Sequence, residues 1–404
     1  MTKEEMSKVN KKEPGNLVLF LLMVSVILTI VPMLSCAPAD ELSEKTNESE
    51  SQFVQSFSVG EPVLDLLYAG GEIWAGTSGG VFCCDPETGE TRQYTEGDGL
   101  GNNVVRNITS DSNGNIWVTC YIEGVCKFDG TEWQHFTVED GLISNDTITM
   151  AADRHGGIWV SAYWGVSYYD GIEWESFTSQ DPDAMVIGGE SPNNPDALLL
   201  EGTDLDAADV IFIDSRGMVW FSNRHDGVTR FDDGKWALFS SENGMEARGV
   251  SAITEDKDSN IWFGSASGAT RYDGSQFTVF PIEGYESIIP RPFIKDIEED
   301  TKGAIWVAAY GGGVSRYDGT GWRVFTMAEG LPDKNGRFIF FDREGNSGVV
   351  TDEGVSILTD TGWRLLTEDD GIPDSKIRSI TTDNTGAVWF GSEKGEISRL
   401  DKMP

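Results

Sequence analysis

The sequence predicts an all-β fold, an eight-bladed β-propeller of four-stranded antiparallel blades, on the basis of three observations. A turn followed by Ile-Trp or Val-Trp recurs at intervals of 43, 42, 61, 42, 44 and 83 residues. Asp-Gly pairs separate short alternating runs, which is typical of β-hairpins. Four short strands fit into each period, as in one propeller blade. The repeating tryptophans are Trp74, Trp117, Trp159, Trp220, Trp262, Trp306 and Trp389.

Two irregular intervals decide the number of blades. The interval of 83 residues contains two periods, because the turn at Asp342 lies near its midpoint, with Gly348 in the tryptophan position. The interval of 61 residues contains an acidic insertion at about residues 179–205. The sequence therefore predicts eight blades, and seven is the alternative if the unit with Gly348 is degenerate.

Within each unit the elements follow one order. The first strand is apolar, as at residues 377–381, and ends in an Asp-x-x-Gly turn. The second strand carries the tryptophan, and the third reads Gly-Val-x-Arg-Tyr, as at residues 313–317. An Asp-Gly turn leads to a fourth strand of the form Trp-x-x-Phe-Thr, as at residues 322–326. We expect the tryptophans to stack in the core, and the basic residue of the third strand to pair with nearby acids.

The ring is expected to close on its own N-terminal strand. The last unit ends after its third strand, at Leu400, and residues 53–58 resemble the fourth-strand pattern. A strand at residues 53–58 would complete the last blade and remove the unpaired edge of an open ring.

These repeats resemble the two-component regulator propeller repeats of the extracellular sensor regions of bacterial hybrid histidine kinases. The matching phrases are residues 369–377, 383–391 and 396–400, and a Gly-Leu or Gly-Ile loop accompanies the tryptophan motif at constant spacing. The resemblance covers residues 53–404 and implies a sensing or binding module. Such kinases continue into a transmembrane helix and a kinase core, whereas this sequence ends after the propeller, so the resemblance implies no signalling output.

The N-terminal region predicts export. Residues 1–35 read as a signal peptide or membrane anchor, since a charged start is followed by the 18-residue apolar run 17–34. Ser35-Cys36 resembles a bacterial lipoprotein site, which makes Cys36 the candidate for lipidation; an N-terminal transmembrane anchor is the alternative. Residues 36–51 read as a flexible acidic tether, and residues 52–404 as the propeller. We expect the propeller at the extracytoplasmic face of the cell membrane, with membrane contact through the N-terminus only.

Composition excludes several functions. The chain has 67 acidic and 30 basic residues, a formal charge of −37, which argues against nucleic-acid binding. Its three histidines have no metal-site spacing, and we expect no metal and no cofactor. Aspartates recur in the first turn of the units, and we interpret them as turn-formers rather than calcium ligands. They are Asp111, Asp153, Asp214, Asp256, Asp300, Asp342 and Asp383.

Residues that depart from the repeat are the candidates for ligand binding, and no catalytic residue is assigned. Loops between the second and third strands carry varied aromatic and charged side chains, as expected for recognition loops on a rigid frame. The candidates there are Tyr121, Tyr163, Trp164, Arg224, His225 and Tyr310.

A second set of candidates lies on the innermost strands. Five residues before the turn aspartate, six blades have Arg106, Asp209, Ser251, Lys295, Arg337 and Arg378. The four basic residues, Arg106, Lys295, Arg337 and Arg378, predict a positive ring near the central channel, which could hold a ligand with a carboxylate or sulfate group. The alternative is that they neutralise neighbouring acids.

The cysteine pattern leaves the pairing open. Besides Cys36, the chain has Cys83, Cys84, Cys120 and Cys126. Cys120 and Cys126 fall on adjacent strands and could bridge a hairpin in an oxidising compartment, but three pairings are possible and the sequence does not choose among them.

The expected function is a ligand-sensing or protein-interaction module, exported and tethered to the membrane, without its own output domain. An unknown small molecule or protein would bind the loops, and a membrane signalling partner is possible. One alternative is a propeller-type lyase or hydrolase, similar in repeat texture to the streptogramin lyases, for which His225 beside Asp226 is the one pair nominated. The other is a structural or adhesive surface protein.

Overall fold

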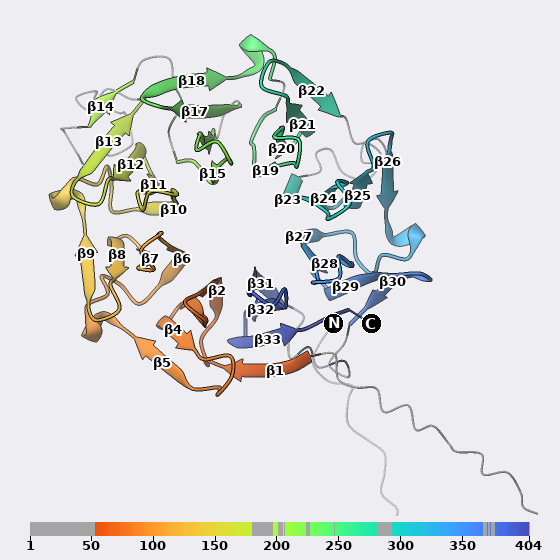
Figure 1. The fold of residues 1–404 in the computed structure, drawn as a ribbon, viewed down its shortest axis with the longest axis horizontal. Coiled ribbons are helices and arrows are strands. Elements are labelled where there is room, and N and C mark those ends of the chain that lie inside the picture. Colours follow the sequence, from red (N-terminus) through yellow and green to blue (C-terminus); the bar gives the residue numbers. More distant parts are fainter. Residues whose placement is uncertain are drawn as a thin grey trace, which may run out of the picture. The chain divides into compact units, whose positions relative to one another are not determined.

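The computed structural model describes residues 53–179, 197–200, 205, 207–223, 227–245, 247–280, 293–366, 370, 372 and 376–403. The chain divides into a unit of residues 1–48 and a unit of residues 49–404, and all described residues lie in the second. They form eight separate sheets around one centre, an eight-bladed β-propeller (Figure 1). The predicted fold and the predicted blade count are confirmed. Within these residues, no helix has the length and apolar character needed to cross a membrane.

Each blade is an antiparallel sheet whose strands follow one another from the channel to the rim. Blades 1 to 4 consist of β2 (Val63–Ala69), β3 (Glu72–Thr77), β4 (Gly80–Cys84) and β5 (Thr91–Tyr94); β6 (Val105–Ser110), β7 (Ile116–Cys120), β8 (Gly124–Phe128) and β9 (Trp133–Phe136); β10 (Thr147–Ala152), β11 (Ile158–Ala162), β12 (Gly165–Tyr169) and β13 (Trp174–Thr178), with the short parallel strand β14 (Leu198–Leu199) added; and β15 (Ile211–Ile213), β16 (Val219–Ser222), β17 (Val228–Asp232) and β18 (Lys235–Phe239).

Blades 5 to 8 repeat the arrangement, and single 3₁₀ turns follow some outer strands. The strands are β19 (Ala252–Glu255), β20 (Ile261–Ser265), β21 (Gly268–Tyr272) and β22 (Phe277–Phe280); β23 (Phe293–Glu299), β24 (Ile305–Tyr310), β25 (Gly313–Tyr317) and β26 (Trp322–Phe325); β27 (Gly336–Phe341), β28 (Ser347–Thr351), β29 (Gly354–Thr359) and β30 (Gly362–Leu365); and β31 (Ile377–Thr382), β32 (Val388–Ser392), β33 (Glu396–Leu400) and β1 (Phe53–Ser58). The 3₁₀ turns are η1 (Glu96–Asp98), η2 (Val138–Asp140), η3 (Ser241–Asn243) and η4 (Met327–Glu329).

The N-terminal strand closes the ring, as predicted. β1 pairs antiparallel with β33 and completes blade 8. Asp65, on the innermost strand of blade 1, joins three blades: its carboxylate accepts hydrogen bonds from Ser379 Oγ of blade 8 at 2.9 Å and from the backbone N–H of Ile108 in blade 2 at 3.0 Å. The first and last blades are therefore held together by a strand pair and by a buried carboxylate.

The repeating aspartates act as turn-formers and as partners of the tryptophans. In blade 6, Asp300 Oδ1 accepts from the backbone N–H groups of Lys302 and Ala304, while Oδ2 accepts from the indole N–H of Trp306 at 3.0 Å. The same indole bond joins Asp111 to Trp117, Asp214 to Trp220, Asp256 to Trp262 and Asp383 to Trp389. The basic residue of the third strand joins this unit, because Arg316 pairs with Asp300 at 3.3 Å and its guanidinium lies over the Trp306 ring.

Blade 7 keeps the fold without the tryptophan. Gly348 pairs with Phe340 on the neighbouring strand, and Phe340 is buried. A Cβ at Gly348 would lie 2.2 Å from the Phe340 ring, so the phenylalanine occupies the space of the missing side chain. Asp342 then accepts from the backbone N–H of Met403 at 2.8 Å in place of an indole. The unit with Gly348 is thus a complete blade.

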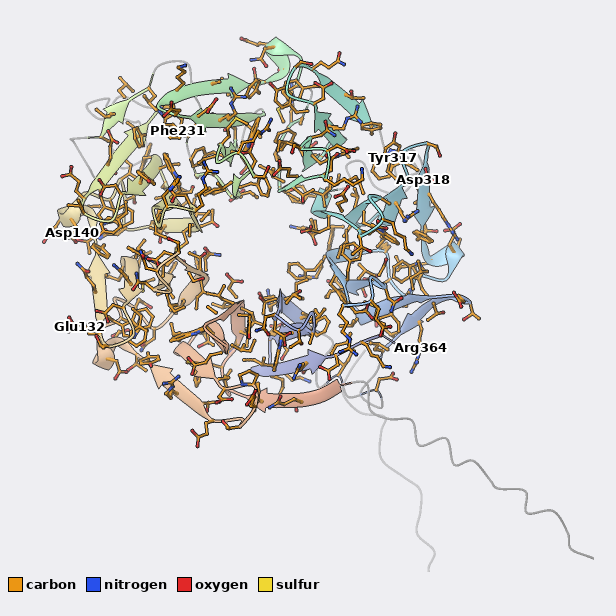
Figure 2. The ribbon with its side chains drawn as sticks, viewed as in Figure 1. Glu132, Asp140, Phe231, Tyr317, Asp318 and Arg364 are labelled. Carbon is orange, nitrogen blue, oxygen red and sulfur yellow. The ribbon has the colours of Figure 1, made fainter. Side chains whose placement is uncertain are left out.

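Acidic side chains lie at the rim of the ring. Glu132 lies just before the outer strand β9, Asp140 ends η2 and Asp318 lies in the turn between β25 and β26. Figure 2 shows these three residues at the periphery of the ring. The acidic surface therefore surrounds an apolar interior that lies between the blades.

Candidate functional site

The candidate site begins with an irregularity of the innermost strands. The register between the first and second strands shifts across Arg106, Lys295, Arg337 and Arg378. Such a shift is a β-bulge, in which the extra residue leaves the ladder and its side chain is redirected. In these four blades the position singled out in the sequence is thus the bulge position, which explains why charged side chains are tolerated on these half-buried strands.

The four basic residues of this position have different partners. Arg337 forms an ion pair with Asp352 at 2.5 Å, and Arg378 pairs with Glu393 at 3.2 Å. These two contacts correspond to the predicted alternative, in which the cations neutralise neighbouring acids.

The other two stack on aromatic rings. Arg106 lies 4.1 Å from the ring centroid of Tyr121, and Lys295 Nζ lies 4.5 Å from that of Phe293. In the part of the chain that the structure describes, Lys295 forms no ion pair with a carboxylate. The bulge position is therefore not a uniform positive ring.

Lys295 and Arg337 face the same cavity, of about 780 Å³, which we call the Lys295 cavity. Blades 4 to 7 supply its lining: Asp209, Val210, Ser251, Phe293, Lys295, Tyr310, Arg337 and Phe338. Burial lowers the pKa of the Lys295 ammonium, and the neighbouring charge of Arg337 lowers it further, while Asp209 opposes this shift. Two cations thus share one partly enclosed space in a strongly acidic protein.

Two aromatic side chains form a wall of the Lys295 cavity. Phe293 and Tyr310 are cross-strand partners at the ends of β23 and β24, and they are 37% and 45% exposed. Exposed rings beside cations can contact the apolar face of a ligand while the cations bind its charged group. The cavity is therefore suited to a small molecule that has both an anionic group and an apolar surface.

The structure brings together only some of the predicted site residues. Lys295, Arg337 and Tyr310 line the Lys295 cavity, whereas Arg106, Tyr121, Tyr163, Trp164 and Arg378 do not. Tyr121 and Tyr163 are exposed in their loops, and Trp164, with φ of 81°, packs on a small cluster around Ile143. Arg224 and His225, with Asp226, lie outside the described residues, as do Cys36, the segments 1–35 and 36–51 and most of the insertion at 179–205.

Sequence reasoning missed part of the lining. Phe293 and Phe338 were not predicted as site residues, although they lie within two residues of Lys295 and Arg337 in the sequence. Asp209 and Ser251 occupy the equivalent repeat position, five residues before the turn aspartate, and only their lack of positive charge kept them out of the candidate set. Repeat position was the signal that would have identified them.

A second cavity, of about 880 Å³, lies among the first turns of blades 2 to 4. Its carboxylates already serve the fold: Asp111 and Asp214 accept from indole N–H groups, and Asp153 accepts from the Tyr168 hydroxyl at 2.9 Å. Among the described residues, no group of three or more His, Cys, Asp or Glu side chains is placed to hold a metal ion.

Known proteins share this fold at low sequence identity. The yeast protein Sqt1 from Saccharomyces cerevisiae is 12% identical with a TM-score of 0.62, over 88% of this chain and 100% of that chain. A catalytically inactive virginiamycin B lyase from Staphylococcus aureus, solved with quinupristin, is 16% identical with a TM-score of 0.51, over 73% of this chain and 94% of that chain. At these identities the likeness concerns the fold.

A further match is an extracellular domain assigned to a hybrid two component system from B. thetaiotaomicron. It is 20% identical with a TM-score of 0.48, over 84% of this chain. This chain spans about half, 51%, of the length of that structure. No curated protein matches the sequence.

One family model matches the sequence itself. The model of the two component regulator propeller matches residues 99–121, which include the Gly-Leu loop, β6 and β7 with Trp117. The resemblance inferred from the repeats is thereby confirmed: residues 99–121 match the two component regulator propeller within an eight-bladed β-propeller.

Proposed function

We propose that this chain is a recognition module that binds a small anionic ligand in the Lys295 cavity. The observation that carries the proposal is the pair of cations, Lys295 and Arg337, in one cavity of a protein with a formal charge of −37. Asp352 already pairs with Arg337, whereas Lys295 forms no ion pair with a carboxylate among the described residues, so a bound anion would compensate the charge of Lys295. A carboxylate, sulfate or phosphate group would relieve the repulsion and accept charge-assisted hydrogen bonds.

The aromatic wall narrows the ligand class. Phe293 and Tyr310 offer ring surface beside Lys295, so an acidic sugar or an aromatic acid fits better than a bare inorganic ion. The match of residues 99–121 to the two component regulator propeller supports a sensory role. A sensor of this kind would act through a separate signalling partner in the membrane.

The test compares Lys295→Met with Lys302→Met in the full-length chain, kept in detergent. Lys302 is exposed in the turn between β23 and β24, so the control removes the same charge away from the cavity. Binding of uronic acids, sulfated sugars and aromatic acids would be measured by thermal shift and titration calorimetry. We expect Lys295→Met to weaken binding about tenfold or more, because a hydrogen bond to a charged group contributes roughly 1.5–3 kcal/mol.

Two results would contradict the proposal. One is an anionic ligand whose affinity is equal in the two variants, and the other is a panel without any binding anion. The second would favour a protein ligand on the loops. Turnover of a ligand that His225→Ala abolishes would instead indicate the lyase.

We further propose that the propeller is exported and anchored at its N-terminus. The support is the apolar run 17–34 followed by Cys36 in the sequence. Metabolic labelling with a fatty-acid analogue is expected to mark the wild-type chain and not Cys36→Ser. Membrane association without label in both chains would instead indicate an uncleaved apolar anchor.

A further inference from the structure

Two of the four described cysteines have sulfur atoms in contact. Cys120 ends β7, Cys126 lies in β8, and their Sγ atoms are 3.1 Å apart. Both side chains are fully buried and both are free thiols in this structure. A disulfide bond is about 2.05 Å long, so the two sulfur atoms need to approach by about 1 Å to form one.

The local backbone explains this contact. Cys120 pairs with Gly124 and Cys126 pairs with Val118, so the two cysteines are diagonal neighbours on one face of the hairpin. Gly124 has φ of 78°, and a Cβ there would lie 2.3 Å from the carbonyl oxygen of Phe136. Because this position must be glycine, no side chain stands opposite Cys120, and the Cys126 sulfur reaches it.

The other two cysteines do not compete on geometry. Cys83 and Cys84 are consecutive residues of β4, so their side chains point to opposite faces of the sheet. Cys83 Sγ accepts a hydrogen bond from Arg92 at 3.3 Å, while Cys84 belongs to the core between blades 8 and 1. The structure therefore favours a bond between Cys120 and Cys126 and leaves Cys83 and Cys84 as thiols.

We infer that Cys120 and Cys126 form a disulfide during folding, by exchange with an oxidised dithiol-disulfide partner such as a thiol oxidoreductase. The Cys120 thiolate attacks the partner's disulfide and forms a mixed disulfide, and one partner thiol leaves. The Cys126 thiolate then attacks the Cys120 sulfur and releases the second partner thiol. Two protons and two electrons leave the chain, and the partner's disulfide becomes a dithiol.

The surroundings of the pair support this order of events. The contact between the two thiols lowers the pKa of Cys120 and raises that of Cys126, which favours Cys120 as the first nucleophile once the hairpin has brought the two sulfur atoms together. The backbone N–H of Gly101 donates to Cys126 Sγ at 3.2 Å, so the loop before β6 covers the pair. Exchange must therefore precede the docking of this loop, and the finished bond is shielded from reductants.

The bond would constrain the hairpin of β7 and β8, whose connecting loop is one of the predicted recognition loops. The loop between β7 and β8 carries the exposed Tyr121, on which Arg106 stacks. Its tip is held by the contact between His135 and the carbonyl oxygen of Glu123 and by the hydrogen bond from Gly124 N–H to Asn145 O at 2.8 Å. A disulfide at the base of the hairpin adds a covalent constraint to these two contacts.

Peptide mapping tests the inference directly. The reduced full-length chain is unfolded in urea with detergent, refolded with reduced and oxidised glutathione, alkylated and digested with trypsin. Cleavage after Arg106 and Lys127 leaves both cysteines in the peptide 107–127. We expect this peptide without alkylation and about 2 Da lighter than its reduced form, since two hydrogen atoms have left. Cleavage after Glu123 should give two fragments that separate only on reduction.

Matched variants and a second measurement keep the test decisive. The double variant Cys83→Ser, Cys84→Ser should form the same bond, and its melting temperature should fall on reduction as in the wild type. Cys126→Ser should show an alkylated Cys120 and no effect of reductant on melting. Two alkylated cysteines in peptide 107–127, or a link from it to Cys83 or Cys84, would overturn the inference. A chain that is folded in the reduced state and only then exposed to oxidised glutathione should keep both thiols, because the docked loop covers them; a bond formed readily there would contradict the requirement that exchange precede docking.

Discussion

At the scale of single residues, carboxyl groups on the innermost strands of blades 1 and 6 bridge neighbouring blades. Asp296 accepts a hydrogen bond from the backbone N–H of Ile339 in the next blade at 2.7 Å, at the strand position that Asp65 occupies in blade 1. Glu298 lies two residues further along β23, on the same face of the strand. Burial raises the pKa of Asp65 and of Asp296 to about 6. Burial, with the charge of Asp296, raises the pKa of Glu298 to about 8.

Each of these raised pKa values predicts a contribution to stability that is present in mild acid and lost as the pH rises. An acid whose pKa is higher in the folded state favours folding at pH below its unfolded pKa, and loses that contribution as the pH rises through the folded pKa. For Glu298 this window runs from about pH 4.5 to about pH 8. We expect Glu298→Gln to raise the free energy of unfolding at pH 8 by on the order of a few kcal/mol, and so to raise the melting temperature there. Near pH 4.5 both should change little.

The matched control is Glu132→Gln, which neutralises an exposed glutamate at the rim (Figure 2). Thermal unfolding of both variants and of the wild type between pH 4.5 and pH 8.5 is the measurement. Equal pH profiles for wild type and Glu298→Gln would show that Glu298 titrates alike in the folded and unfolded chain.

At the scale of the blade, one side chain per sheet fills a fixed space between neighbouring blades. In seven blades a tryptophan on the second strand occupies it, and in blade 7 a phenylalanine on the first strand does so. The exchange preserves packing because Phe340 and Gly348 are direct cross-strand partners. In blade 8 the corresponding pair is Thr381 and Trp389.

Because Phe340 takes the place of the missing tryptophan in blade 7, a double substitution should restore stability that a single one removes. Gly348→Trp alone should destabilise the protein by about 3 kcal/mol or more, since two aromatic side chains would compete for one space. Combining it with Phe340→Thr recreates the pair of blade 8, and Asp342 regains an indole donor. We expect the double variant to recover most of the lost stability in urea unfolding. If the double variant loses as much free energy of unfolding as the two single variants together, Phe340 does not take the place of the tryptophan.

At the scale of the whole molecule, stability depends on a closed ring. Each blade packs only against its two neighbours, so an interruption anywhere leaves two faces exposed. The closing contacts join residues 53–58 to residues 396–400, more than three hundred positions away. The strand β1 also covers the edge of β33, which would otherwise offer unpaired backbone groups to another chain.

Removal of this strand should therefore open the ring. We expect deletion of residues 1–58 to lower the melting temperature and to cause concentration-dependent association, measured by calorimetry and by light scattering. Deletion of residues 1–51, which ends before β1, is the control and should leave a monodisperse propeller. An equally stable and monodisperse chain without residues 53–58 would show that blade 8 does not need its fourth strand.

The sequence by itself determined the blade number, the order of strands and the closure by residues 53–58. These features follow from local patterns, because turn residues and alternating apolar positions act within a few residues of one another. The sequence also identified the basic residues at the bulge position, through their constant spacing from the turn aspartate.

Only the tertiary structure decided which of these residues meet. Lys295 and Arg337 share a cavity with Asp209, Arg337 and Arg378 pair with Asp352 and Glu393, and Arg106 stacks on Tyr121. The same holds for the contact between Cys120 and Cys126. Such contacts depend on how neighbouring strands and blades are placed across the channel, and on which small residue leaves room beside them. The lining of the Lys295 cavity comes from positions as far apart as Asp209 and Phe338, and no periodic pattern in the sequence encodes their distances.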